Sequence, residues 1–514
     1  MKNFANEPFT NFALSENAEA IKSAIAQVRQ ELGKTYPLYI GEETIYNDDL
    51  IISTNPANEN EIIGKVAKAN LAQAEQAIET AYATFKSWSK VEAEERAIYL
   101  FKAAERMRQR KHYFSAWLIL ESGKNWAEAD ADTAEAIDFM NFYAHEMLRY
   151  ANPPELIPVN GEYNKMKYVP LGVGVVIPPW NFPLAIMAGM TVASVVTGNT
   201  VVLKPASATP VIAAKFMELL QEVGLPSGVV NYLPGSGGAI GDYLVSHKLT
   251  RFINFTGSKE VGLRISELAA KVAPGQKWIK RVAAEMGGKD SIIVDETADL
   301  DKAAQGIVAS AFGFQGQKCS ACSRAIVVES VYEEVIEKVL ALASKLAMGL
   351  PEENFSTGPV IEKRAMEKIL EYIEIGKTEG TLVLGGERFG NQGWFVRPTI
   401  FKDIAPTARI SLEEIFGPVL ALIKVKDFAE ALAVVNNTEY GLTGSLYSRN
   451  RENIAQAKEE FNVGNLYFNR KCTGALVGVH PFGGFNMSGT CSKAGGYDYL
   501  GLLMQMKITS ETLG

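Results

Sequence analysis

The spacing of apolar residues divides the chain into a helical part and a part that mixes strands with helices. Residues 70–150 place apolar side chains every three or four positions, which predicts a series of amphipathic helices. Residues 35–67 alternate apolar and polar positions between Asn-Pro and Asn-Glu-Asn turn signals, which predicts strand hairpins. A further helical pattern covers residues 17–32.

From Val173 onwards, short apolar runs alternate with helical patterns. The first series contains apolar runs at residues 174–177, 200–203, 229–232 and 251–255. Strands joined by helical crossovers predict a parallel sheet that is covered on both faces and binds ligands at the carboxyl ends of its strands. A second series begins at Ser291 and runs to an apolar stretch at residues 464–468. The chain is therefore predicted to be an α/β protein with two such units.

Two segments belong to neither series. Residues 156–168 could form a strand pair around the turn signal Asn160-Gly161, and residues 500–513 form a separate tail. Both are candidates for contacts between subunits.

Charge and composition exclude some classes of partner. The chain has 51 basic and 59 acidic residues and no basic cluster, which argues against nucleic acid. Residues 168–203 carry no charge, but four prolines interrupt them and the longest helix-compatible run, 183–197, is shorter than the roughly 20 residues that span a membrane. Four cysteines do not make a disulfide framework, and the polar N-terminus lacks a signal-peptide pattern. We expect a cytoplasmic protein.

The most informative stretch is Phe312–Cys322, which holds two of the four cysteines. Gly316, Gln317 and Lys318 argue against apolar burial of Cys319. Free backbone N–H groups at the end of a helical pattern and the adjacent lysine are expected to favour the thiolate. Cys319 is therefore a candidate nucleophile.

Three other interpretations of this stretch remain open. Cys319 and Cys322 could be a redox pair, or half of a zinc site that would need two further ligands. Cys319 could also pair with a histidine in a hydrolase, for which His480 is the one histidine in a predicted loop.

Two other motifs offer partners for a nucleophile. Glu285 precedes two glycines and could present a general base, although a lone glutamate is more often a solvated surface residue. Asn181 follows the strand 174–177 in a loop fixed by prolines and Trp180, where its amide could stabilise an oxyanion. An asparagine that satisfies its own turn is the ordinary alternative.

Two motifs of the first series suit a phosphate-containing cofactor. Gly257, Ser258 and Gly262 lie where a strand turns into a helix, and the free N–H groups of such a helix end can bind a pyrophosphate. The usual G-x-G-x-x-G pattern is absent, so this signal alone is weak. Lys204 ends the second strand of the same series and could reach ribose hydroxyls or phosphate.

Seven motifs, in order over roughly residues 40–510, resemble those of the aldehyde dehydrogenase superfamily. They are Pro179-Trp-Asn-Phe-Pro, Leu203-Lys-Pro-Ala, Phe255-Thr-Gly-Ser, Glu285-Met-Gly-Gly-Lys, Gly316-Gln-Lys-Cys, Glu413-Glu-Ile-Phe-Gly-Pro and Pro481-Phe-Gly-Gly. Gln-Lys-Cys-Ser-Ala-Cys and the stretch 473–484 resemble more narrowly the 1-pyrroline-5-carboxylate dehydrogenase branch, which oxidises L-glutamate γ-semialdehyde to glutamate.

The resemblance implies a fold, a domain division and partners. It implies a Rossmann-like parallel-sheet NAD(P) domain, an α/β catalytic domain and a small β oligomerisation flap. We assign 1–155 and 170–286 to the cofactor-binding domain, 287–480 to the catalytic domain, and 156–169 and 490–514 to oligomerisation. The implied partners are an amino-acid semialdehyde and a second copy of the chain, in a homodimer or an assembly of dimers, with no metal.

The resemblance also implies a role for each matching residue. Cys319 would be the nucleophile, Asn181 with the Cys319 N–H the oxyanion hole, and Glu285 the base that activates water. The residues implied for the cofactor are Lys204, Gly257, Ser258, Gly262, Glu414, Phe416, Trp180 and Ser207. Those implied for the substrate are Ser320, Gly474 and Ala475 at its carboxylate, Phe482 and Phe182 along its aliphatic part, and Glu135 at its amino group.

One position departs from the family pattern. Members that use NAD alone often carry a glutamate three residues after the strand-end lysine, whereas this chain has Ser207. NAD is the implied cofactor, but no charge at this position repels the 2′-phosphate of NADP.

Overall fold

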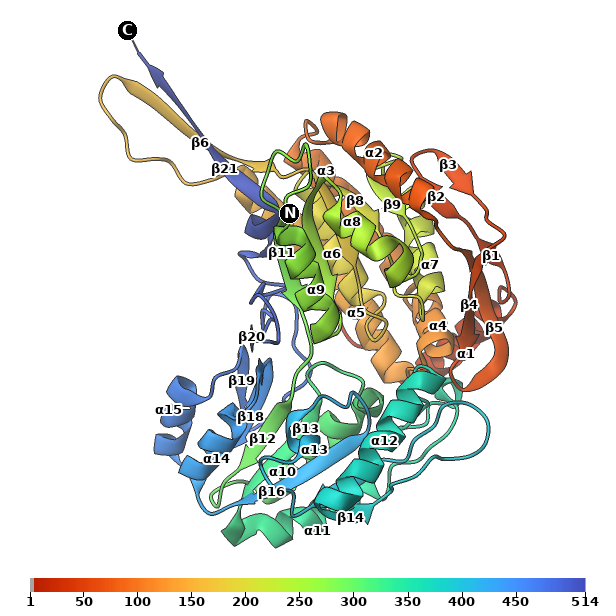
Figure 1. Cartoon of the computed structure of the whole chain (residues 1–514), viewed down its shortest axis with the longest axis vertical. Coiled ribbons are helices and arrows are strands. Elements are labelled where there is room, and N and C mark those ends of the chain that lie inside the picture. Colours follow the sequence, from red (N-terminus) through yellow and green to blue (C-terminus); the bar gives the residue numbers. More distant parts are fainter. Residues whose placement is uncertain (1–3, 514) are drawn as a thin grey trace.

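The computed structural model describes residues 4–513 and consists of two halves, each built around a seven-stranded sheet (Figure 1). The helices of the first half are α1 (Ser15–Arg29), α2 (Leu71–Trp88), α3 (Ala93–Gln109), α4 (Lys111–Ser122), α5 (Trp126–Ala151), α6 (Ala185–Val196), α7 (Pro210–Glu222), α8 (Asp242–Ser246) and α9 (Lys259–Ala270). Its sheet contains β2 (Leu38–Ile40), β3 (Glu43–Ile45), β7 (Val173–Ile177), β8 (Thr200–Leu203), β9 (Val230–Tyr232), β10 (Thr250–Thr256) and β11 (Arg281–Glu285).

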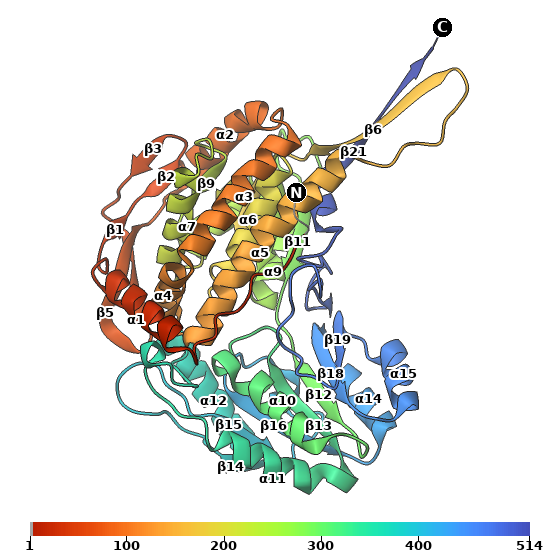
Figure 2. The ribbon, with the colours of Figure 1, turned by 180° about the vertical axis from the view of Figure 1, so that it is seen from behind.

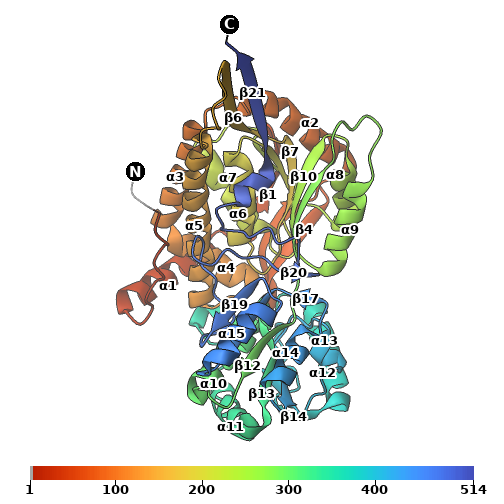
Figure 3. The same cartoon turned by 90° about the vertical axis from the view of Figure 1, so that its left-hand side faces the viewer.

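The first sheet has the order β11-β10-β7-β8-β9-β2-β3, in which the first five strands are parallel. After β9 the chain crosses to β10 on the other side of β7, so the direction of winding reverses beside β7. In open α/β sheets the crevice at such a reversal is where ligands bind. Figure 3 shows α5 and α6 on one face of the sheet and α8 and α9 on the other.

Close packing explains why these strands can lie buried on both faces. β7 and β8 consist almost entirely of buried β-branched and small residues. A Cβ atom added at Gly174 of β7 would lie 2.1 Å from the ring of Phe252 on β10, so the glycine makes room for that ring. A small three-stranded sheet of β1 (Thr35–Tyr36), β5 (Asn58–Ala67) and β4 (Leu50–Asn55) extends this half.

The second half is wound around the sheet β14-β15-β16-β13-β12-β18-β19, which is parallel except for the edge strand β14. Its strands are β12 (Asp290–Val294), β13 (Cys322–Val328), β14 (Thr381–Leu384), β15 (Thr399–Lys402), β16 (Val419–Val425), β18 (Thr443–Tyr447) and β19 (Asn465–Phe468). Its helices are α10 (Leu300–Phe312), α11 (Tyr332–Ala343), α12 (Lys363–Glu379), α13 (Arg409–Leu412), α14 (Phe428–Asn436) and α15 (Arg451–Glu460). The short strands β17 (Tyr440–Gly441) and β20 (Phe485–Asn486) pair beside it.

A two-stranded arm projects from the first half (Figure 1). Strand β6 (Glu162–Pro170) pairs in antiparallel register with β21 (Met504–Thr512) along its whole length. The predicted strand pair around Asn160-Gly161 is therefore wrong. The turn signal there is real, since Gly161 has a φ of +81°, but the strand after it finds its partner in the tail instead of in the residues before the turn.

The apolar stretch that suggested a membrane check is an interior part of this fold. Its residues form β7, α6 and β8 of the first half. Across residues 4–513, no helix combines the length and apolar character required to cross a membrane.

Candidate functional site

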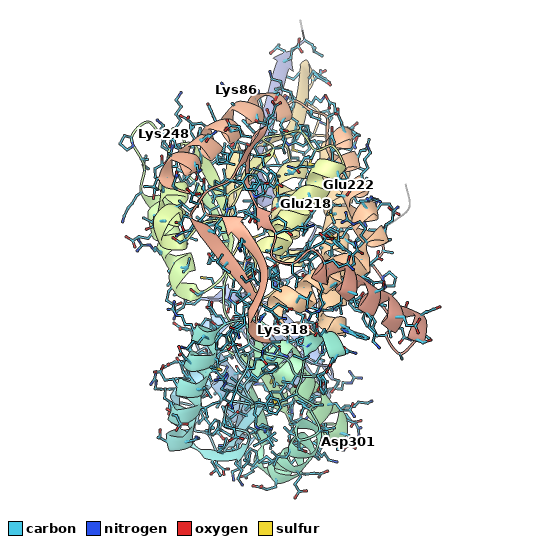
Figure 4. All side chains as sticks on the ribbon, turned by 90° about the vertical axis from the view of Figure 1, so that its right-hand side faces the viewer. Lys86, Glu218, Glu222, Lys248, Asp301 and Lys318 are labelled. Atoms are coloured by element: carbon cyan, nitrogen blue, oxygen red, sulfur yellow. The ribbon has the colours of Figure 1, made fainter. Side chains whose placement is uncertain are left out.

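A cavity of about 510 Å³ lies where the two halves meet and brings most of the predicted catalytic and substrate residues together. Cys319 and Glu285 both line it. So do the predicted substrate residues Ser320, Gly474, Ala475, Phe482, Phe182 and Glu135. Residues from widely separated motifs therefore face one enclosed space. Figure 4 labels Lys318, the neighbour of Cys319, close to the junction of the halves.

Cys319 lies in the connection between α10 and β13, after a 3-10 turn over residues 313–316. In that turn Phe314 and Gln315 adopt left-handed backbone conformations, with φ of +48° and +55°. Non-glycine residues rarely take this conformation, and such strain concentrates at functional sites. Cys319 follows this turn and lines the cavity.

The expectation that the surroundings of Cys319 favour the thiolate is wrong for this structure. Burial, followed by the negative charges of Asp290, Glu414 and Glu285, raises the pKa of the thiol well above its usual range. Lys318 does not compensate, because its ammonium group binds Glu128 at 2.7 Å. The preceding helix also presents its carboxyl end, where free carbonyl groups carry negative partial charge.

Asn181 lies beside the nucleophile. It is buried in the loop between β7 and α6, and its Nδ2 donates a hydrogen bond to the carbonyl of Gln317 at 3.0 Å. The amide therefore ties the first half to the cysteine loop of the second. A donor at this position can stabilise negative charge that develops on a substrate oxygen.

Two buried charged residues, Asp132 and Lys124, hold the same loop in place. The Asp132 carboxylate accepts the backbone N–H of Ala185 at 2.7 Å, and Lys124 lies 3.3 Å from the other oxygen of Asp132. The Lys124 ammonium group also lies 3.9 Å from the ring centre of Phe182 and 4.3 Å from that of Phe314. These contacts hold Phe182, next to Asn181, against the turn that precedes Cys319.

Glu285 is the last residue of β11. One carboxylate oxygen accepts the N–H of Gly484 at 3.3 Å, and the other accepts the N–H and the hydroxyl of Ser492. Burial raises the pKa of this carboxyl to about 7, and these hydrogen bonds act in the opposite direction. Such a group can take up a proton near neutral pH.

The predicted cofactor residues of the first half lie at the carboxyl ends of its strands. Lys204 directly follows β8, and its ammonium group makes no hydrogen bond or ion pair with the other described residues. Burial lowers its pKa to about 8. Ser207 is exposed on the loop that follows. A buried lysine without an internal partner fits a site for ribose or phosphate oxygens.

Gly257 and Ser258 form the turn from β10 into α9. The Ser258 hydroxyl caps that helix by accepting the N–H of Val261, and Ser258 is exposed, so solvent reaches the positive helix end at this turn. Gly262 is buried, and a Cβ there would lie 2.4 Å from Met286 Sδ. Gly262 therefore permits close packing of the helix on the strand and does not face an open site.

The second half supplies Glu414 and Phe416 in the segment before β16. Glu414 accepts the N–H of Gly288 at 3.1 Å, and burial raises the pKa of its carboxyl. Phe416 has a φ of +60°, and its ring packs edge-on against that of Trp180 at 5.5 Å. These residues join the two halves on the side of the predicted cofactor.

The predicted substrate loop, residues 473–480, is held by Arg470, which donates to the carbonyls of Thr473 and Gly474 at 3.1 Å each. Gly474 itself is exposed and has a φ of +82°, so its backbone turns sharply at the cavity edge. Across the cavity, burial and the charges of Asp132 and Asp138 raise the pKa of Glu135 to about 8.

The alternative interpretations of the cysteine loop find no support in the geometry. Cys322 is buried at the start of β13, where its thiol donates to the carbonyl of Arg324, and the chain's four cysteines, all in the described part, are free. His480 lines the cavity, but its Nδ1 accepts the N–H of Leu476 and its Nε2 lies 3.3 Å from Arg470 Nη1. Among residues 4–513, no hydrogen bond links His480 to Cys319.

Three features of the site were not predicted. Ser492 holds Glu285, Glu128 neutralises Lys318, and Phe9 and Thr10 from the N-terminal segment line the cavity. None of them lies in a recognisable motif. A serine 207 residues away from its carboxylate leaves no local signal in a single sequence.

Comparisons with known proteins agree with this geometry. The model of the aldehyde dehydrogenase family matches residues 45–509. The chain is 61% identical over 511 residues to 1-pyrroline-5-carboxylate dehydrogenase of Geobacillus kaustophilus, covering 99% of each chain. The structure of 1-pyrroline-5-carboxylate dehydrogenase from Thermus with bound NAD superimposes with a TM-score of 0.98, at 55% identity, covering 100% of this chain and 99% of that one.

A longer protein contains the same fold. Proline utilization A (PutA) from Bdellovibrio bacteriovorus matches 99% of this chain with 53% of its own length, at 44% identity and a TM-score of 0.98. The predicted fold class and the resemblance on which it rested are confirmed. The chain belongs to the aldehyde dehydrogenase family and, as a member of it, is an NAD(P)-dependent oxidoreductase.

Proposed function

We propose that the protein oxidises L-glutamate γ-semialdehyde, the open form of 1-pyrroline-5-carboxylate, to L-glutamate, as a step in the breakdown of proline or arginine. The observation that carries this proposal is the single cavity that holds Cys319, Glu285 and the loop 473–480. The names of its relatives from Geobacillus and Thermus support the same reaction.

The first stage of the proposed mechanism, formation of the thioester, takes place at Cys319. Its thiolate attacks the aldehyde carbon, and the charge that forms on oxygen is stabilised by Asn181 Nδ2 and the Cys319 N–H. Because the structure raises the pKa of the thiol, loss of its proton is a demanding part of this step. NAD(P), when bound, would supply the acceptor for the hydride that leaves the adduct carbon, and Cys319 would then carry the thioester.

Glu285 acts in the second stage of the mechanism, the hydrolysis of the thioester. It lines the same cavity and has a pKa of about 7, so its ionised form can take a proton from water near neutral pH. The resulting hydroxide attacks the thioester, releases glutamate and restores the cysteine. The hydrogen bonds from Gly484 and Ser492 compete for the carboxylate, and we propose that Glu285 exchanges one of them for this water.

The predicted cofactor residues of the two halves of the molecule fit NAD(P). Lys204 would bind the adenosine ribose, Gly257 and Ser258 the pyrophosphate, and Glu414 the nicotinamide ribose, with Phe416 and Trp180 beside it. Gly262 would contribute by letting α9 approach. NAD is the proposed cofactor, and the uncharged Ser207 leaves NADP use open.

The other side of the cavity fits an amino acid. Ser320 and the backbone of Gly474 and Ala475 would bind the α-carboxylate, while Phe182 and Phe482 flank the aliphatic chain. Glu135 would bind the α-ammonium group, whose charge favours the ionised carboxylate and thus lowers its pKa from about 8.

We also propose that the arm mediates assembly into dimers. It exposes Tyr163, Met506 and Ile508, and an isolated pair of strands is only marginally stable in water. The division into a cofactor-binding domain (1–155 and 170–286), a catalytic domain (287–480) and oligomerisation segments (156–169 and 490–514) belongs to the same proposal.

A panel of aldehydes tests this function. NADH formation is measured at its absorbance band with glutamate semialdehyde, succinate semialdehyde and propanal, each with NAD and NADP. We expect the highest kcat/KM for glutamate semialdehyde with NAD. A preference for an aldehyde without the amino-acid group would contradict the proposed substrate while leaving the enzyme class intact.

A further inference from the structure

The N-terminal segment, residues 4–12, precedes the first helix and lies along the side of α5 (Figure 2). Two buried carboxylates of α5 hold it. Thr10 donates its N–H to Asp130 at 2.8 Å and its hydroxyl at 2.6 Å. Asp138, two turns further on, accepts the N–H of Glu7 at 2.6 Å and the Asn6 amide at 2.9 Å. Buried carboxylates need such donors, so the attachment is specific.

Basic residues of neighbouring helices strengthen the attachment. Lys111 binds Asp130 at 2.9 Å and the carbonyl of Pro8 at 2.8 Å, and Arg108 binds Glu7 at 2.7 Å. The segment is therefore an ordered part of the first half and not a loose extension.

The same segment reaches the loop 473–480. Asn6 Nδ2 donates to the carbonyl of Val477 at 2.9 Å, across 471 residues of sequence. The ring of Phe4 packs against Phe142 and lies 3.2 Å from the position that a Cβ on Gly478 would occupy. Further along, Phe9 and Thr10 line the cavity itself, and Phe9 is 60% exposed.

We propose that residues 4–12 form one wall of the substrate cavity and fix the loop 473–480 in place, which makes them a specificity element for aldehydes that carry an α-carboxylate. This inference rests on the proposed function, in which Gly474 and Ala475 bind that carboxylate. Asn6 and Phe4 are positioning residues, since they act through Val477 and Gly478.

Two full-length variants, Asn6→Ala and Phe4→Ala, test the proposal. Losing one such contact is worth about 1 kcal/mol, so we expect KM for glutamate semialdehyde to rise about fivefold. Propanal has no carboxylate, and its kcat/KM should change by less than about twofold. The control is Asn17→Ala, which removes an exposed bond of the same length, from Asn17 Nδ2 to the carbonyl of Asn11 at 2.9 Å, within the N-terminal region.

A second readout needs no substrate. Hydrogen exchange of peptides that cover residues 473–480 should be faster in both variants than in the wild type and in Asn17→Ala. Unchanged exchange, or an equal loss of activity toward both aldehydes, would overturn the proposal. If the wild type does not oxidise glutamate semialdehyde, the proposed function and the specificity role both fail, and exchange still decides whether the segment holds the loop.

Discussion

The two sheets contribute to the site from opposite ends. In the first sheet the predicted residues follow the carboxyl ends of parallel strands, as Lys204 follows β8 and Gly257 follows β10. In the second sheet two of them precede strands, as Cys319 precedes β13 and Glu414 precedes β16. The carboxyl edge of one half therefore faces the amino edge of the other.

This difference has electrostatic consequences. At the carboxyl edge a strand leads into the positive end of a helix, which suits an anionic cofactor. At the amino edge the chain arrives from the negative end of α10, and Asp290 and Glu414 add their charges near Cys319. On the cofactor side, backbone groups can thus stabilise the negative charge of a ligand. On the nucleophile side, negative charge has to be stabilised by groups of the opposite half.

The largest effect is expected at the amino edge. Cys319→Ser should lower NADH formation with glutamate semialdehyde by at least about 10³-fold, because a serine hydroxyl is a far weaker nucleophile without an adjacent base. Steady-state rates by absorbance measure this. Normal turnover would contradict the nucleophile assignment. Cys491→Ser is the control, since Cys491 is exposed.

The next largest effect is expected at Glu285, where a substitution should separate thioester formation from thioester hydrolysis. In Glu285→Gln, Cys319 and Asn181 remain, so we expect a burst of about one NADH per site followed by turnover roughly 10²-fold slower. Rapid mixing with saturating aldehyde measures both phases. Loss of the burst would show that Glu285 acts before the thioester forms.

The rate of the slow step, thioester hydrolysis, should depend on pH. Glu285 accepts a proton only when ionised, so in the wild type the rate of thioester hydrolysis should rise with pH through about 7 and fall below it. The Gln variant should lack this transition.

At the carboxyl edge, Lys204→Met should weaken the cofactor without changing the chemistry. The ammonium group has no partner within the described chain, so its loss should leave the fold intact and raise KM for NAD about tenfold. Initial rates at varied NAD measure this, with the exposed Lys248→Met (Figure 4) as the control. A change in kcat alone would place Lys204 elsewhere in the mechanism.

The smallest expected effect concerns the charges around Cys319 at the amino edge. Glu128→Gln releases Lys318 from its ion pair, and an unpaired cation beside Cys319 should lower the pKa of the thiol. Alkylation of the Cys319 peptide by iodoacetamide, followed by mass spectrometry as a function of pH, measures the midpoint. The exposed Glu371→Gln should leave it unchanged.

Local patterns predicted local structure well. The helical pattern predicted to end before Cys319 is α10, and the strands of the first series were found because they are short, apolar and bounded by turn signals. The motifs also led to Cys319, Glu285 and the loop 473–480, whose assembly around one cavity the structure shows. Their chemical roles stay predictions.

The missed features depend on contacts between distant residues. The partner of β6 is β21, and no local signal distinguishes it from a hairpin around Gly161. The expected thiolate failed for a related reason, since Lys318 is adjacent to Cys319 in sequence but paired with Glu128 of α5. Sequence adjacency indicates which groups are near, and packing decides which way they point.

The bond between Asn6 and Val477 has a consequence for the order in which the protein folds. It joins residues 471 positions apart, and the pairing of β6 with β21 joins residues such as Lys165 and Thr509, which are 344 positions apart. Closing such long loops costs entropy before any contact offsets it, which slows folding. During synthesis the first half would leave the ribosome with β6 unpaired and Asn6 without its Val477 partner, so the arm and the N-terminal segment should complete their native contacts only after the second half has emerged.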